Sequence, residues 1–112
     1  MTALPCDSTN NARFTIPASP GAGKYLFICS GEWDTNLTNE RIIAYAKNGS
    51  AVRFLNRLGG LANTIATMGG AVVESMSVGD YFTMQAYQDS GGTRTIGANN
   101  GNTWAVCVYL GS

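Results

Sequence analysis

Short runs of alternating side chains, separated by turn-forming residues, follow one another along most of this chain. Aromatic, β-branched and threonine residues suited to a pleated strand fill each run, and glycine, proline, asparagine or aspartate ends it. About nine short strands at regular spacing are typical of a β-sandwich or jelly roll. We place eight of these strands at residues 13–16, 24–33, 41–47, 51–55, 61–68, 71–78, 80–88 and 103–110.

Turn signals between the runs fix most of the strand ends. Asn48-Gly49 is the strongest of them, because a type I′ hairpin turn needs positive φ at both central residues. We expect further turns over residues 57–60 and at Gly69-Gly70. Residues 50–67 allow a second interpretation as a helix, because apolar residues recur there about every third position, although the pair Gly59-Gly60 disfavours it.

Two of the predicted strands are apolar on both faces. In residues 103–110, Trp104, Val106, Val108 and Leu110 alternate with Ala105, Cys107 and Tyr109. In residues 24–33, Leu26 and Ile28 alternate with Tyr25, Phe27, Cys29 and Trp33. A strand of a small antiparallel sandwich normally has one polar face. The second apolar face therefore indicates contact with another copy of the chain, the alternative being a strand covered on both sides within a monomer.

The length of 112 residues fits one domain. The fourteen glycines and the abundant threonine, asparagine, serine and valine support an all-β protein with many turns. We predict a polar N-terminal arm over residues 1–12 and a single domain over residues 13–112. The N-terminus lacks the charged start and apolar run of a signal peptide, and no apolar run is long enough to span a membrane.

Charge and residue chemistry argue against several function classes. Seven basic and seven acidic residues give no net charge, whereas nucleic-acid and anionic-membrane binding require clustered Lys and Arg. Without histidine the chain has no Ser-His or Cys-His nucleophile pair. The carboxylates are scattered, so a calcium site near Asp34 or Asp89 would lack the acidic cluster that it prefers. We predict no catalytic residues, no cofactor and no metal.

The three cysteines have no metal-ligand spacing. We interpret Cys6, Cys29 and Cys107 as reduced thiols, with the last two acting as small core residues. A Cys29–Cys107 disulfide is the alternative, if their strands are neighbours.

Several motifs, taken in order, resemble the trimeric jelly roll of tumour necrosis factor and of the globular head of complement component one-q. They are Thr15-Ile-Pro17, Gly23-Lys-Tyr-Leu-Phe27, Arg41, Asn48-Gly49, Val78-Gly-Asp80, Gln85-Ala-Tyr87, Ser90-Gly-Gly92 and Thr103-Trp104. The resemblance covers roughly residues 12–111 and is closest to the prokaryotic and phage versions of the fold.

The resemblance implies a homotrimer whose inner sheet holds residues 24–33, 80–88 and 103–110 and packs around the threefold axis. Within residues 80–88 we assign Phe82, Met84 and Ala86 to the core. The opposite face of that strand then meets the neighbouring subunit, where aromatic and polar side chains are common. The predicted interface residues are Tyr81, Thr83, Gln85 and Tyr87.

Two functions are compatible with such a trimer. The first is a non-enzymatic structural protein of a phage virion, a capsid decoration or cement protein that binds the major capsid protein or another virion protein. The short predicted arm favours this role over the second, the tip of a tail or head fibre that recognises a host-surface glycan or protein. For a fibre tip, loop residues would be the contacts, and the candidates are Trp33, Arg57, Arg94 and Asn99. Either protein would be made in the host cytoplasm and reside in the virion.

Overall fold

The computed structural model describes residues 2–4, 13–33, 40–59, 66–88 and 103–112, and these residues contain β-strands and no helix. All pairings between the strands are antiparallel. The all-β prediction is therefore confirmed for the part of the chain that is described. The strands are β1 (Thr2–Leu4), β2 (Phe14–Thr15), β3 (Gly23–Trp33), β4 (Arg41–Lys47), β5 (Ser50–Leu58), β6 (Ala66–Met76), β7 (Tyr81–Gln88) and β8 (Trp104–Gly111).

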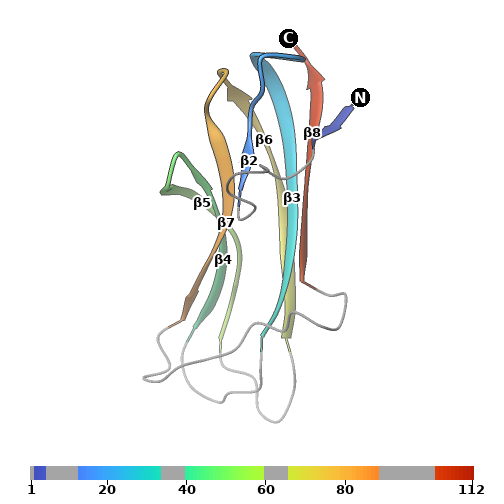
Figure 1. Cartoon of the computed structure of the whole chain (residues 1–112). Helices are drawn as coiled ribbons and strands as arrows, with labels where there is room; N and C mark the ends of the chain where they lie inside the picture. The colour runs from blue at the N-terminus through green and yellow to red at the C-terminus, as the bar shows by residue number, and fades with distance from the viewer. Residues whose placement is uncertain (1, 5–12, 34–39, 60–65, 89–102) are drawn as a thin grey trace.

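The strands form two four-stranded sheets that face each other as the two layers of a β-sandwich (Figure 1). Sheet A has the order β1-β8-β3-β6, and sheet B has the order β2-β7-β4-β5. The two longest strands, β3 and β6, pair over their whole length, from Gly23 opposite Met76 to Trp33 opposite Ala66. Strand β1 belongs to the predicted N-terminal arm, and it extends sheet A by pairing with β8.

Aromatic side chains from both sheets make the centre of the core. Phe27 of β3 stacks on Phe82 of β7, with 4.9 Å between ring centroids and 10° between ring planes. Phe14 contacts the Phe27 ring edge-on, and Tyr45 of β4 lies beside Phe82. Apolar residues from six strands complete this cluster, so burial between the layers is the main force that holds the sheets together.

The predicted turn at Gly69-Gly70 is wrong, because both glycines lie inside β6. Neither has a positive φ, so turn geometry is not why glycine stands there. A Cβ atom on Gly70 would lie 2.8 Å from the Cβ of Leu55 and 2.9 Å from its carbonyl oxygen. The missing side chain lets β6 of sheet A approach β5 of sheet B closely.

The region around β5 also differs from prediction. The helix over residues 50–67 is wrong for its first half, because Ser50–Leu58 is a strand. The turn expected to start at Arg57 starts later, since Arg57 and Leu58 still pair with β4. The two strands predicted over residues 61–68 and 71–78 are one strand, Ala66–Met76, and residues 61–65 lie outside the described residues.

The inner sheet implied by the family resemblance is only partly correct. Strands β3 and β8 are neighbours in sheet A, as expected. The strand predicted over residues 80–88 is wrongly placed, because β7 belongs to sheet B, between β2 and β4. Its tyrosines and its glutamine therefore lie on the other layer of the sandwich from β3 and β8.

A polar cluster joins two turns at one end of the sandwich. The Asn48-Gly49 hairpin turn is confirmed, with φ of 53° and 86°. The Asp80 carboxylate accepts hydrogen bonds from the backbone N–H of Ser77 and from Nδ2 of Asn48, both at 2.9 Å. Asp80 therefore fixes its own turn, as expected for an Asp at a turn, and also ties that turn to the β4–β5 hairpin.

Candidate interaction surfaces

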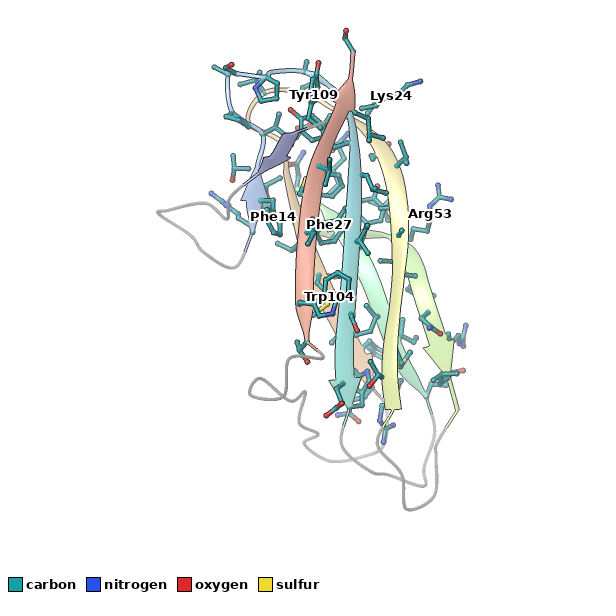
Figure 2. All side chains as sticks on the ribbon, turned by 90° about the vertical axis from the view of Figure 1, so that its right-hand side faces the viewer. Phe14, Lys24, Phe27, Arg53, Trp104 and Tyr109 are labelled. Carbon is teal, nitrogen blue, oxygen red and sulfur yellow. The ribbon has the colours of Figure 1, made fainter. Side chains whose placement is uncertain are left out.

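The outer face of sheet A carries mainly apolar side chains along β3, β6 and β8. Figure 2 views the molecule from this side and shows β8, β3 and β6 next to one another, with Trp104 on β8 and Lys24 at one end of β3. The strand registers place Leu26 between Val108 and Val73, and Ile28 between Val106 and Ala71. We call this surface the A face; its residues are Leu26, Ile28, Ser30, Ala71, Val73, Trp104, Val106, Val108 and Leu110.

Large apolar side chains of the A face are open to solvent. Val73 is 54% exposed, Trp104 46%, Leu110 40% and Val106 38%. The charged residues on this face of β3 are Lys24 and Glu32, which lie towards the two ends of the strand. Tyr25, Phe27 and Cys29 on the inner face of β3 are buried in the core. The A face is therefore the second apolar face that the sequence pattern predicted for this strand.

The predicted interface residues of β7 lie on the outer face of sheet B. Phe82 is fully buried and Met84 packs against the core, so the assignment of these two to the core is confirmed. Ala86 was wrongly assigned to the core, because it is exposed near the end of the strand. Tyr81, Thr83, Gln85 and Tyr87 point the other way, as predicted, and the proposal that they contact a neighbouring subunit stays a prediction.

These four outward residues differ in their contacts within the chain and in their exposure to solvent. The guanidinium of Arg13 lies 4.3 Å from the centre of the Tyr81 ring, and Nε2 of Gln85 donates a hydrogen bond of 3.3 Å to the carbonyl oxygen of Gly49. Thr83 is partly buried, whereas Tyr87 is 56% exposed. Tyr87 is therefore the one of the four that offers most of its surface to a partner.

A shallow pocket of about 290 Å³ opens beside Tyr87. The only polar side chains among its lining residues are those of Gln85 and Tyr87, and none is charged. Phe54, which is 58% exposed, belongs to the lining and comes from the edge strand β5. Phe54 is not among the predicted contact residues, although Val52 and Phe54 occupy alternate positions of a predicted strand. The lining residues are Ile42, Ala44, Ala51, Phe54, Gln85, Ala86 and Tyr87.

The candidate loop contacts are not assembled into one site among the described residues. Trp33 is only 3% exposed and belongs to the core, with the guanidinium of Arg41 5.8 Å from its ring centre. Arg57 of β5 is exposed and forms a bidentate ion pair with Glu40, the residue before the neighbouring strand β4. Arg94 and Asn99 lie outside the described residues. The described pair therefore has roles inside the chain, one in packing and one in an ion pair.

The ionisable side chains of the described residues do not form a metal-binding cluster. No group of three or more cysteine or acidic residues gathers there as a metal site would require, and no helix there is long and apolar enough to cross a membrane. Tyr45 donates a hydrogen bond of 2.6 Å to Glu74, and burial together with this bond raises the pKa of the tyrosine. The Tyr45 hydroxyl therefore stays protonated at neutral pH and donates its hydrogen bond to Glu74.

The two described cysteines are free and buried. Cys107 lies opposite Phe27 and Cys29 opposite Ala105, so the two thiols are diagonal neighbours on adjacent strands rather than a direct pair. The alternative of a Cys29–Cys107 disulfide is therefore wrong for this structure. Burial raises the pKa of Cys29 to about 11 and that of Cys107 to about 12, which leaves both as unreactive thiols at neutral pH.

Comparison with known proteins does not assign the chain to a family. No family model matches it, and no curated protein has a detectably similar sequence.

Proposed function

We propose that this protein is a non-enzymatic structural protein that works as a homotrimer, and that its role is to decorate or cement a phage capsid. The observation that carries the proposal is the A face. It presents exposed Val73, Trp104 and Val106, whereas the charged side chains on this face of β3, Lys24 and Glu32, lie towards the two ends of the strand. Isolated apolar residues are normal on a protein surface, but a contiguous patch of them marks a site of association.

The form of the assembly is argued from the fold. Eight strands in the orders β1-β8-β3-β6 and β2-β7-β4-β5 are compatible with a jelly roll, a fold of eight strands in two sheets in which the chain crosses between the sheets at every connection except that of β4 and β5. The sequence motifs resemble the jelly rolls that form trimers. We therefore place the A face, which contains β3 and β8, towards the threefold axis, in place of the β7 residues that the sequence suggested.

The virion role rests on the resemblance to phage versions of this fold and on the lack of catalytic groupings among the described residues. A closed threefold assembly of a small sandwich is suited to the threefold positions of an icosahedral shell. The partner would be the major capsid protein or another virion protein. Recognition of a host-surface receptor as part of a fibre is the competing role.

The self-association is tested with a matched pair of variants. Val106→Asp places a charge on the A face, and Tyr87→Asp places the same charge on a residue of sheet B that is at least as exposed. Light scattering should give wild type and Tyr87→Asp a mass three times the 11.8 kDa of one chain, and Val106→Asp the mass of one chain. A monomeric wild type, or dissociation by Tyr87→Asp alone, would contradict this assignment of the A face.

The virion role has a separate test. The purified wild-type protein is added to emptied phage capsids and, in parallel, to host cells. Saturable binding to capsids supports the decoration role, whereas binding to cells alone supports the receptor-binding alternative.

A further inference from the structure

The side chains of the edge strand β5 change from exposed to partly covered about halfway along the strand. Ser50, Ala51, Val52, Arg53 and Phe54 are all exposed, whereas Leu55 and Asn56 are partly covered. The covered half lies against β6, where Leu55 contacts Gly70 and Nδ2 of Asn56 donates a hydrogen bond of 3.3 Å to the carbonyl oxygen of Gly69. The exposed half is the side of the β4–β5 hairpin that projects from the sandwich in Figure 1.

The exposed half of β5 has β4 on one side and an open edge on the other, since β5 is the last strand of sheet B. Two irregularities in the β4–β5 register lie along this half, next to Ala44 and Ala46. An open edge presents backbone N–H and C=O groups to which another extended chain can add as a further strand. A site of strand addition also needs side chains that select the incoming segment.

The side chains of this half-strand offer two different chemistries. Phe54 belongs to the pocket of about 290 Å³ on the outer face, together with Ala51 of the same strand. Arg53 follows the opposite alternation, opposite Tyr45 in the register, and it is exposed. The ion pairs found among the described residues involve Lys47 with Asp80 and Arg57 with Glu40, and they leave Arg53 without a carboxylate partner.

We propose that the edge of β5 from Ser50 to Phe54 binds an extended segment of a partner protein that alternates apolar and acidic side chains. The apolar side chains would lie on the Phe54 side, next to the pocket, and the acidic ones on the Arg53 side. A second copy of this strand is a poorer occupant, because edge-to-edge pairing would bring two Arg53 guanidiniums together. The pocket lining is uncharged, which fits an apolar group.

The test uses two capped heptapeptides as probes, one alternating leucine with glutamate and the other alternating leucine with lysine. Each is titrated into isotope-labelled protein and followed by NMR. The glutamate peptide should shift the amide signals of Ser50–Phe54 and the methyl signals of Ala44 and Ala51. The lysine peptide should bind about two- to fivefold more weakly, as expected for one exposed ion pair, and Arg53→Glu should reverse the order.

A matched pair of truncations checks the pocket. Phe54→Ala should weaken the glutamate peptide, whereas Val73→Ala removes a similarly exposed side chain from the A face and should leave its affinity unchanged. Absence of binding, equal affinity for both peptides, or shifts confined to the A face would overturn the proposal. Concentration-dependent shifts of Ser50–Phe54 without peptide would instead identify a second copy as the occupant. The titration is repeated on Val106→Asp, so its outcome does not depend on the trimer.

Discussion

Replacing Gly70 by alanine tests whether β6 runs through the Gly69-Gly70 pair and packs directly on β5. The new methyl carbon would lie 2.8 Å from the Cβ of Leu55 and 2.9 Å from its carbonyl oxygen. These atoms belong to the backbone or to the root of a side chain, so one sheet must move. Overpacking of this kind costs about 1–3 kcal/mol, and the lower chain entropy of alanine in the unfolded state returns about 0.4–1 kcal/mol.

We therefore expect Gly70→Ala to lower the free energy of unfolding by roughly 1–2 kcal/mol. For a chain of this size, the entropy of unfolding is such that each kcal/mol of lost unfolding free energy lowers Tm by about 4 °C. Tm should therefore drop by roughly 4–8 °C. Thermal unfolding followed by circular dichroism measures the change. Gly59→Ala is the matched control, because nothing lies within 4 Å of its added Cβ and its φ is not positive.

The reasoning is refuted if Gly70→Ala is as stable as the Gly59→Ala control. That result would mean that the sheets do not approach closely at this point and that the pair forms the turn suggested by the sequence. A loss of stability in both variants would instead point to a general cost of replacing glycine in this region.

Two further predictions concern titratable groups. Hydrogen bonds from Asn48 and from the backbone of Ser77 lower the pKa of Asp80 below its usual 3.8, so the carboxylate should stabilise the fold above pH 3.8 and lose this effect as the pH falls through the lowered pKa. Urea titrations should show Asp80→Asn less stable than wild type at neutral pH but similar to it in strong acid. A stability difference that is the same at every pH would contradict the role of the charge. Burial raises the pKa of Cys29 to about 11 and that of Cys107 to about 12. In a Cys6→Ser variant, neither remaining thiol should therefore react with a thiol reagent at pH 8 until urea unfolds the protein. Rapid labelling of the folded protein would show instead that the core opens.

The alternation of side chains predicted which way most strand residues point. In β3 the buried side chains are those of Tyr25, Phe27 and Cys29, whereas Leu26 and Ile28 face outward. Successive side chains of a strand point to opposite faces regardless of which strands are its neighbours. The hairpin at Asn48-Gly49 was equally predictable, since positive φ is a local requirement. These features depend on residues that are neighbours in the sequence.

The features that the sequence did not predict depend on distant contacts. Position 70 requires a glycine because Leu55, fifteen positions earlier in the sequence, lies against it. In the sequence alone, a pair of glycines indicates a turn equally well. The sheet to which β7 belongs was inferred from family resemblance, whereas its backbone pairings, such as those of Phe82 with Lys47 and Phe14, place it between β4 and β2. Phe54 became a candidate only when β5 proved to be an edge strand.

The placement of the two candidate surfaces bears on the proposed role. A decoration protein that works as a trimer must hold its own copies together and must also bind the shell, so one apolar surface is not sufficient. Here the A face belongs to sheet A, whereas the exposed half of β5 and its pocket belong to sheet B. Because the two sheets are opposite layers of the sandwich, packing of copies through the A face would leave the outer face of sheet B open. Loss of capsid binding in Arg53→Glu with the trimer intact would connect the two surfaces to one function.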